Sequence, residues 1–263
     1  MTTTWQFLHT GFSSGSRNMD FDVDLARKAA SGGKVSTVRV YGWNPPAISL
    51  GWNQSWDEIR MDRVEAAGID VVRRPTGGRG ILHENELTYS VVMHAEGANI
   101  PSIYNKISLA LVAGLQTLGV DASLERSQPH FPSLYRKVEA AACFVSSARN
   151  EIMVGGKKLV GSAQRRYAAA KGGEIVLQHG SILLGPEHRR LVDFLVLTPD
   201  QREYLSEQLT SRTTDLREVL GTAVSFEDVA SAVRTGFEEV WNVDFDSKSS
   251  THSAEYLHVE SKT

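Results

Sequence analysis

Cysteine is almost absent from this sequence of 263 residues, in which Cys143 is the single thiol. One thiol cannot form an intrachain disulfide, and it cannot provide the several thiolates of a cysteine-rich metal site. The lack of disulfides is typical of proteins in a reducing compartment. We therefore expect a cytoplasmic protein that binds no metal ion.

Long apolar runs are also missing from the chain. No stretch of about 18 consecutive apolar residues occurs, so we expect no helix that spans a membrane. The first residues, MTTTWQFLHTG, contain neither the basic region nor the apolar region of a secretory signal peptide. The sequence predicts a soluble protein that has no membrane among its partners.

Charge of one sign is not in large excess. The 28 lysines and arginines nearly balance the 31 acidic residues, which gives a net charge of −3. This balance gives no overall attraction to a nucleic acid, so we expect no nucleic-acid partner. Basic residues do gather in two parts of the sequence, at Arg73, Arg74, Arg79, Lys157, Lys158, Arg165 and Arg166.

The residues that are present predict a globular protein, because 41% are hydrophobic and the chain is long enough to bury a large core. Apolar alternation and short apolar runs predict strands at residues 5–8, 35–43, 69–73, 87–94, 150–154, 158–165 and 174–184, and residues 48–52 form a short apolar piece. Helical spacing predicts helices at residues 18–30, 58–67, 103–118 and 226–241, with further helical pattern from residue 187. Neighbouring hairpins among interleaved helices favour an α+β fold with a central mixed or antiparallel sheet flanked by helices. We expect residues 1–245 to form one domain and the polar residues 246–263 to be disordered.

Residues 73–92, RRPTGGRGILHENELTYSVV, combine the end of a strand with a glycine-rich loop. Gly77 and Gly78 allow a ligand to approach the backbone closely, and backbone N–H groups of such a loop can bind an anion or a carbonyl oxygen. Arg79 and His83 follow within a few residues. The segment is neither a Walker loop nor a GxGxxG fingerprint. A tight loop between strands, with solvated arginines, explains the pattern equally well.

A second segment, GGKKLVGSAQRR, reads as the second half of a β-hairpin whose turn is Gly155–Gly156. Alternation predicts one face that carries Lys158, Val160, Ser162 and Gln164, and an opposite face that carries Leu159, Gly161 and Ala163. A lysine, a hydroxyl and an amide beside small residues would leave room for a ligand against the first face. A solvated lysine at the start of a strand is the simpler explanation of the hairpin alone.

Cys143 lies among small and apolar residues, in AACF, which favours a buried core position. A nucleophilic cysteine needs a lowered pKa or a neighbouring base, and none is adjacent in the sequence. His83, His130 and His179 become candidate bases only if folding brings them close.

Together these segments resemble the superfamily that joins lipoate–protein ligases, biotin–protein ligases and octanoyltransferases. RRPTGGRGILHENELTYSVV resembles its arginine–glycine loop, with His83 at the position of the superfamily histidine. GGKKLVGSAQRR resembles its lysine motif, with Lys158 at the position of the invariant lysine. AACF and LQHGSILL resemble one branch, the LipM-type octanoyltransferases. The likeness runs from about Trp5 to Trp241, and Gly80 departs from it, since alanine is usual there.

The resemblance implies the biotin/lipoate-ligase catalytic domain, which is related to the cores of class II aminoacyl-tRNA synthetases. It implies transfer of octanoyl from octanoyl-acyl carrier protein to a lysine of lipoyl domains, in 2-oxoacid dehydrogenase E2 subunits or the glycine cleavage H protein. Cys143 would carry the acyl group as a thioester, and Lys158 would activate the carbonyl and the amine. The other implied site residues, all for substrate binding, are Arg73, Arg74, Thr76, Gly77, Gly78, Arg79, His83, Gly161, Ser162, Ala163 and His179. Gly77, Gly78, Gly161 and Ala163 are small enough to line an apolar slot for the octanoyl chain.

The donor thioester is already activated, so we expect no cofactor, and we expect a monomer. Four alternatives remain open. The chain could be an ATP-dependent lipoate ligase, or an amidotransferase that moves octanoyl between two lipoyl domains. It could also be a non-catalytic acyl-binding module. Without the family likeness, a cysteine hydrolase with His83 or His179 as its base would remain a fourth possibility.

Overall fold

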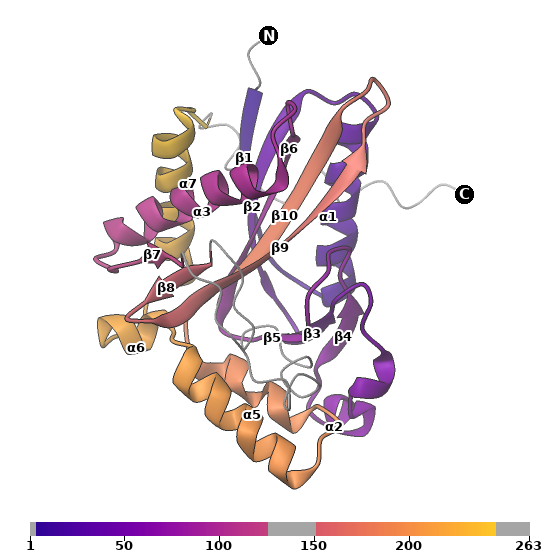
Figure 1. The fold of residues 1–263 in the computed structure, drawn as a ribbon, viewed down its shortest axis with the longest axis vertical. Helices are drawn as coiled ribbons and strands as arrows, with labels where there is room; N and C mark the ends of the chain where they lie inside the picture. Colours follow the sequence, from indigo (N-terminus) through magenta and orange to yellow (C-terminus); the bar gives the residue numbers. More distant parts are fainter. Residues whose placement is uncertain (1–3, 126–150, 246–263) are drawn as a thin grey trace.

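A computed structural model describes residues 4–125 and 151–245 of the protein. Its central element is a seven-stranded sheet with the strand order β1-β2-β6-β10-β9-β8-β7 (Figure 1). The first two strands are parallel and all other neighbouring strands are antiparallel. The predicted α+β class with a mixed sheet is therefore confirmed. The seven strands are β1 (Thr4–Ser13), β2 (Val35–Trp43), β6 (Glu86–His94), β7 (Ser123–Leu124), β8 (Ile152–Val154), β9 (Lys157–Ala168) and β10 (Glu174–Leu183).

Six α-helices and two 3-10 helices lie in the described part of the chain. The α-helices are α1 (Gly15–Ala30), α2 (Met61–Ala66), α3 (Ile100–Thr117), α5 (Pro199–Arg212), α6 (Leu216–Leu220) and α7 (Phe226–Trp241). The 3-10 helices are Trp56–Glu58 and Pro186–Asp193. Side-chain caps fix several N-termini, because an oxygen that accepts from a free backbone N–H satisfies a donor that the helix itself leaves unpaired. Such caps are Asn99 of α3, Thr198 of α5, Asp215 of α6 and Ser225 of α7.

A second, three-stranded sheet was not predicted. It has the order β4-β3-β5 and consists of β3 (Ala47–Leu50), β4 (Asp70–Arg73) and β5 (Ile81–His83). The glycine-rich loop, residues 74–80, connects β4 to β5. Strands β5 and β7 were missed because three and two residues are too few to show an alternation.

The predicted hairpin of β8 and β9 is confirmed, and Gly155 and Gly156 take positive φ angles of 55° and 77° in its turn. The helix predicted over residues 58–67 is wrong in its first part. Residue Ile59 is extended there, because it pairs in a β-bridge with Leu195, and α2 begins only at Met61. The helical pattern after residue 187 begins as a 3-10 helix instead of an α-helix.

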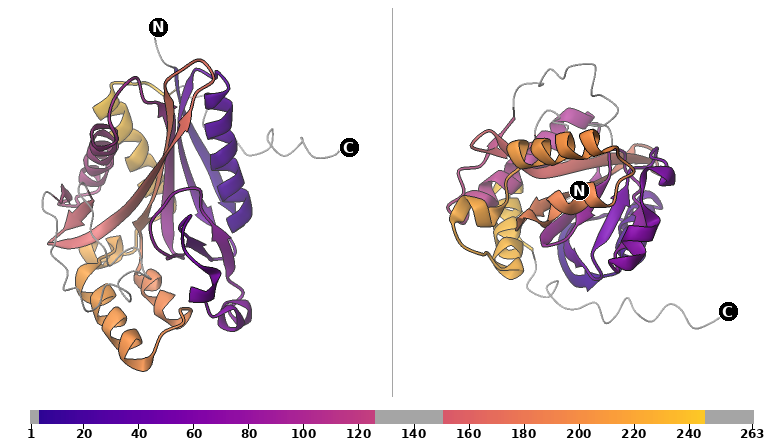
Figure 2. Two further views of the ribbon diagram at one scale, coloured as in Figure 1. Left: turned by 45° about the vertical axis from the view of Figure 1, so that its right-hand side comes forward. Right: turned by 90° about the horizontal axis from the view of Figure 1, so that it is seen from below.

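The two faces of the seven-stranded sheet are covered by different helices (Figure 2). Helix α1 lies against one face, and α3 and α7 lie against the other. Side chains of residues that pair across the sheet share a face. One row on the α1 face consists of Gly161, Ser181, Thr88 and Tyr41. On the opposite face Ser162 contacts Tyr89, whose hydroxyl lies 2.7 Å from the serine Oγ.

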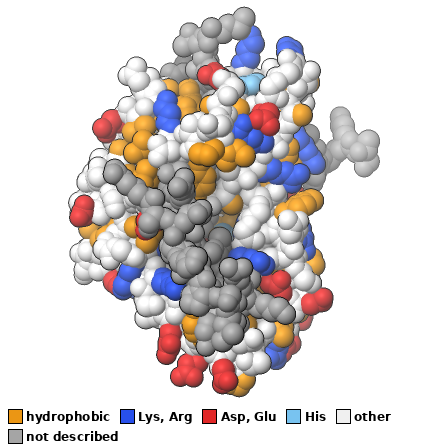
Figure 3. Space-filling model, in the orientation of Figure 1, with side chains coloured by type: hydrophobic (Ala, Val, Ile, Leu, Met, Phe, Trp, Pro, Cys, Tyr) orange, Lys and Arg blue, Asp and Glu red, His pale blue; other side chains and the backbone are white. Residues whose placement is uncertain are grey.

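Acidic and basic side chains are interspersed on the face of the molecule seen in Figure 3. No helix in the described residues is both long and apolar enough to cross a membrane. The tail predicted to be disordered, residues 246–263, lies outside the described residues.

Helices α3 and α7 approach each other closely through glycine. A Cβ added at Gly236 would collide with the Ala110 carbonyl oxygen and the Gly114 amide nitrogen, and one added at Gly114 would collide with the Ala232 carbonyl oxygen. Both glycines are buried. The backbones of the two helices are therefore in direct contact at this crossing.

We predict that Gly236→Ala lowers the free energy of unfolding by about 1–3 kcal/mol, because the added methyl group forces the two helices apart. Helix propensity alone predicts the opposite sign, a gain of about 1 kcal/mol. Urea denaturation followed by circular dichroism distinguishes the two. Ser231→Ala, at an exposed position of the same helix, is the control and should change stability little. A Gly236→Ala variant more stable than wild type would contradict the close crossing.

Candidate functional site

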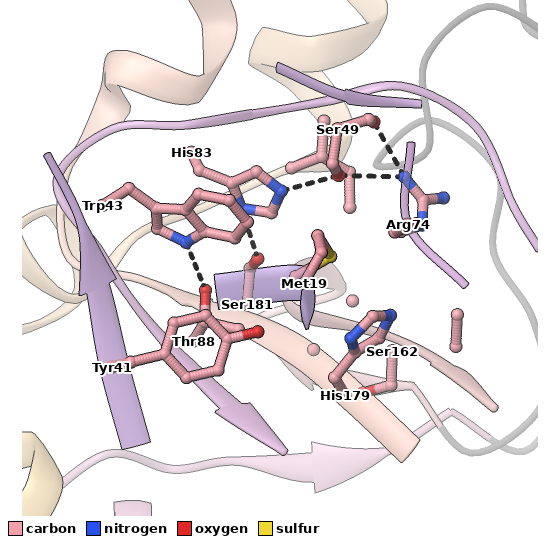
Figure 4. A pocket seen from close by; sticks show the side chains of 14 residues that line it. Met19, Tyr41, Trp43, Ser49, Arg74, His83, Thr88, Ser162, His179 and Ser181 are labelled. Atoms are coloured by element: carbon pink, nitrogen blue, oxygen red, sulfur yellow. Dashed lines mark hydrogen bonds between the residues drawn. The ribbon is translucent and has the colours of Figure 1, made fainter. Parts of the chain in front are cut away.

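A narrow cavity lies between the α1 face of the seven-stranded sheet and the smaller sheet (Figure 4). Carbon atoms form most of its accessible wall. Residues that are far apart in the sequence line it: Met19, Tyr41, Trp43, Ser49, Arg74, Ile81, His83, Thr88, Gly161, Ser162, Ala163, His179, Gly180 and Ser181. Segments from α1, both sheets and the glycine-rich loop thus meet around one apolar space.

The floor of the cavity changes from small to large residues across the sheet. Gly161 and Ala163 of β9 lie opposite Ser181 and His179 of β10, and Tyr41 of β2 ends the same row. One edge of β9 pairs with β10. Along the other edge, β8 pairs only as far as Val160, and no described strand pairs with the residues that follow. The cavity is therefore roomy beside this edge of the sheet and becomes filled toward β2.

Arg74 holds the glycine-rich loop in place. Its guanidinium donates to the carbonyl oxygens of Gly77, at 2.8 and 3.1 Å, and of Arg79, at 2.7 Å. It also donates to the backbone oxygen and the hydroxyl of Ser49 in β3, at 2.8 and 3.1 Å. A buried arginine whose planar fork meets this many acceptors fixes the loop against the small sheet.

His83, one of the lining residues, belongs to a buried network of hydrogen bonds. Its Nδ1 donates to Oε1 of Glu86 at 2.9 Å, and its Nε2 lies 2.7 Å from the Ser49 hydroxyl. Trp43 stacks on the imidazole at 4.0 Å between ring centroids, and its indole N–H donates to Thr88 at 2.7 Å. The ring orientation of His83 is therefore fixed from three sides.

A second series of buried hydrogen bonds runs from α1 to the glycine-rich loop. The carboxylate of Asp22 accepts from Arg39 at 2.7 Å, from Ser90 at 2.8 Å and from the Nδ1 of His179 at 3.4 Å. The other ring nitrogen of His179 lies 2.6 Å from the Thr76 hydroxyl. Asp22 can only accept, so the His179 proton is on Nδ1 and the Thr76 hydroxyl donates to Nε2.

The pKa shifts in this chain have clear physical causes. Burial by itself would raise the pKa of Asp22, but the nearby Arg39 charge and the hydrogen bonds that the carboxylate accepts hold it below its ordinary value of 3.8. Burial lowers the pKa of His179 below its ordinary 6.5 and outweighs the attraction of Asp22. At neutral pH Asp22 is thus ionised and His179 is neutral.

Lys158 is buried, with 2% of its surface exposed, and its Nζ lies 2.6 Å from Oε1 of Glu151. The interpretation as a solvated lysine is therefore wrong. Its backbone carbonyl accepts from Thr214 at 3.0 Å. Lys158 precedes Gly161 by three residues on β9, and it is not among the residues that line the cavity.

The structure brings six of the predicted site residues together on the cavity wall: Arg74, His83, Gly161, Ser162, Ala163 and His179. Thr76 joins them through His179. Of the four small residues expected to line an apolar slot, Gly161 and Ala163 line this cavity, whereas Gly77 and Gly78 are exposed and do not.

Arg73 and Arg79 are not on the cavity wall either. Arg73 donates to the carbonyl oxygens of Gly51, Trp52 and Gln54, so it braces the neighbouring loop. Arg79 contributes its backbone oxygen to Arg74. Cys143 and His130 lie outside the described residues.

The side chains of Ser162 and Gln164 already have hydrogen-bond partners within the protein, and of the two only Ser162 is among the cavity-lining residues. Ser162 meets the Tyr89 hydroxyl, and Gln164 donates to Gln178 at 2.9 Å, on the face that α3 covers. The cavity lies over the opposite face, where Gly161 and Ala163 leave space.

Sequence reasoning missed Met19, Tyr41, Trp43, Asp22 and Glu151. Their importance depends on contacts across more than one element, which local patterns do not show. The nearest signal was Asp22, a carboxylate inside the otherwise apolar spacing of the first helix.

We predict that Asp22→Asn lowers the free energy of unfolding by about 3–5 kcal/mol at pH 7, because it leaves Arg39 buried without its charge partner. The folded-state pKa of Asp22 lies below its ordinary 3.8, so the wild-type advantage is present above that value. It should shrink only as the pH falls below about 4. Urea titrations of both proteins at pH 7, 5, 4 and 3 measure the difference.

The control is Asp24→Asn, which removes an exposed carboxylate two residues further along α1 and should cost less than about 1 kcal/mol. A cost for Asp22→Asn as small as that of the control would contradict the proposed role of the buried pair.

Comparisons with known proteins bear on the family and the fold of this chain. The model of the family described as Lipoyl protein ligase A/B catalytic domain matches residues 14–238. Octanoyltransferase LipM of Kyrpidia tusciae is 39% identical over 242 residues, which cover 90% of this chain and 86% of the relative. Octanoyltransferase LipM of Bacillus subtilis is 34% identical over 248 residues, which cover 91% and 87%.

Among solved structures, the fold is similar to the bi-partite lipoate protein ligase of Thermoplasma acidophilum. The TM-score is 0.73 at 22% sequence identity, with 92% of this chain and 86% of the other covered. At that identity the likeness concerns the fold, whereas the LipM relatives and the family match span most of the chain at higher similarity. The resemblance found in the sequence motifs is thus confirmed, and the chain belongs to the lipoyl protein ligase A/B catalytic domain family.

Proposed function

We propose that this protein transfers an octanoyl group from octanoyl-acyl carrier protein to a lysine of a lipoyl domain. The observation that carries the proposal is the narrow apolar cavity beside the glycine-rich loop, in a chain that is 39% identical to an octanoyltransferase LipM. Its narrow shape and its mostly carbon wall suit a linear saturated chain.

The cavity supplies the binding free energy for the acyl chain. Each methylene that leaves water contributes about 0.8 kcal/mol, so the six methylenes of octanoyl contribute up to about 5 kcal/mol. Polar groups of the wall, such as His83 and His179, already have hydrogen-bond partners within the protein. They therefore do not require a ligand with polar groups along its chain.

Acyl transfer proceeds in two steps with Cys143 as the carrier. The Cys143 thiolate attacks the carbonyl carbon of the donor thioester, and the carrier-protein thiolate leaves. The acceptor lysine amine then attacks the new thioester, the C–S bond to Cys143 breaks, and the amide forms with loss of the amine proton. Exchange of one thioester for another is nearly balanced, and amide formation drives the cycle forward.

Lys158 provides the positive charge for both steps. A cation close to the carbonyl oxygen stabilises the negative charge that develops there during attack. A cation close to the acceptor amine also favours its neutral, nucleophilic form. The bond to Glu151 holds Lys158 in one orientation, so the charge is placed before substrate binds.

The first test is the reaction itself. Purified protein is mixed with octanoyl-acyl carrier protein and an unmodified lipoyl domain without ATP, and the octanoylated domain is detected by mass spectrometry. Product formation without ATP is expected. A requirement for ATP with free octanoate or lipoate would instead identify a ligase, and transfer only from an octanoylated lipoyl domain would identify an amidotransferase.

We predict that incubation with octanoyl-acyl carrier protein alone gives an octanoyl adduct on Cys143 that hydroxylamine removes, because a thioester is labile to this nucleophile. Intact-mass and peptide mass spectrometry measure the adduct. Cys143→Ala should show neither adduct nor transfer. Transfer by Cys143→Ala at the wild-type rate would exclude Cys143 as the acyl carrier.

We predict that Lys158→Arg lowers the transfer rate at least tenfold, because the guanidinium keeps the charge but cannot reproduce the position of the ammonium beside Glu151. Initial rates of lipoyl-domain octanoylation measure the effect. The matched control is Lys157→Arg, since Lys157 is partly exposed and pairs with Glu218 on the surface. Equal rates for wild type and Lys158→Arg would remove Lys158 from the mechanism.

A further inference from the structure

We propose that Met19 of α1 sets the length of the acyl chain that the cavity accepts. This inference rests on the proposed function, because it assigns a specificity determinant to the same cavity. Chain length in a closed apolar slot depends on where the slot ends and on what fills that end.

The closed end of the cavity lies at the β2 side of the sheet. Met19, Tyr41, Trp43 and Ala47 form an apolar cluster of their own, separate from the main core. Tyr41 has no exposed surface, and Met19 and Trp43 have only 6% and 7%. The opposite side is formed by Gly161 and Ala163 of β9, the strand that also carries Lys158. An acyl group that enters from the side of Gly161 and Ala163 therefore directs its methyl end toward this cluster.

Two of the three large residues at the closed end are held by hydrogen bonds. The Tyr41 hydroxyl donates to Asp22 at 3.0 Å. The Arg39 guanidinium carbon lies 3.8 Å from the centroid of the Tyr41 ring. Trp43 donates to Thr88 and stacks on His83. These contacts leave both aromatic rings little freedom to move for a longer ligand.

Met19 is different, because an unbranched thioether with several rotatable bonds is held by packing alone. Figure 4 shows its side chain among the residues that surround the cavity, between Trp43 and His179. Of the three residues, Met19 is the one whose size can change without the loss of a hydrogen bond.

The backbone at Met19 is fixed independently of its side chain. The side-chain amide of Asn18 donates to the carbonyl oxygens of Gly42 at 2.9 Å and Ser13 at 3.2 Å. Three residues further along, Asp22 anchors the helix to the sheet. Truncation of Met19 should therefore enlarge the cavity, since α1 is not free to move inward and fill the space.

The experiment measures kcat/KM for carrier protein loaded with six-, eight-, ten- and twelve-carbon saturated acyl groups. For Met19→Ala we expect the ratio of decanoyl to octanoyl transfer to rise about tenfold, because two more methylenes enter an apolar site. For Met19→Phe we expect the ratio of octanoyl to hexanoyl transfer to fall about tenfold. The control is Met61→Ala, because Met61 is half exposed on α2, away from the cavity, and the variant should keep the wild-type ratios.

Wild-type chain-length ratios in both Met19 variants would overturn the inference, provided that each variant shows a cooperative thermal transition. If Met19→Ala does not fold, Met19→Val is measured in its place, and unchanged ratios in that variant would overturn it equally. Absence of transfer by the wild-type protein from every acyl-carrier protein would contradict the proposed function instead. The two failures are therefore distinguishable.

Discussion

Asp22 carries a negative charge with no exposed surface, and the arrangement of the site depends on how this charge is satisfied. Four donors reach its carboxylate from three strands: Arg39 and Tyr41 of β2, Ser90 of β6 and His179 of β10. A buried carboxylate without such partners would be strongly unfavourable, so the position of α1 on the sheet is closely defined. Since Met19 belongs to the same helix and lines the cavity, the contacts of Asp22 also fix the position of Met19.

The same carboxylate is linked to the glycine-rich loop by hydrogen bonds through His179 and Thr76. Asp22 keeps the proton of His179 on Nδ1, which leaves Nε2 to accept from Thr76. Arg74 holds the loop from its other side through the carbonyl oxygens of Gly77 and Arg79. The glycine-rich loop is thus fixed by buried polar groups, while its two adjacent glycines remain exposed.

Polar and apolar residues have separate tasks in this site. The polar side chains around the cavity are hydrogen-bonded to other groups of the protein, and the accessible wall consists mainly of carbon. This division suits a long hydrocarbon chain, for which binding free energy comes from burial and not from specific hydrogen bonds. Lys158, whose ammonium pairs with the buried Glu151, belongs to β9, the strand whose Gly161 and Ala163 line the cavity.

The sequence by itself determined the fold class, the hairpin of β8 and β9, and the family. These depend on local patterns: alternation, the Gly155–Gly156 turn and motifs of contiguous residues. It also indicated Arg74, His83 and His179, because they lie inside those motifs. Only the tertiary structure decided which face of β9 borders the cavity, that Lys158 is buried against Glu151, and that Met19, Tyr41 and Trp43 close the space. The physical reason is that side-chain packing and buried charge pairs join residues that are distant in the chain, and no local pattern records such contacts.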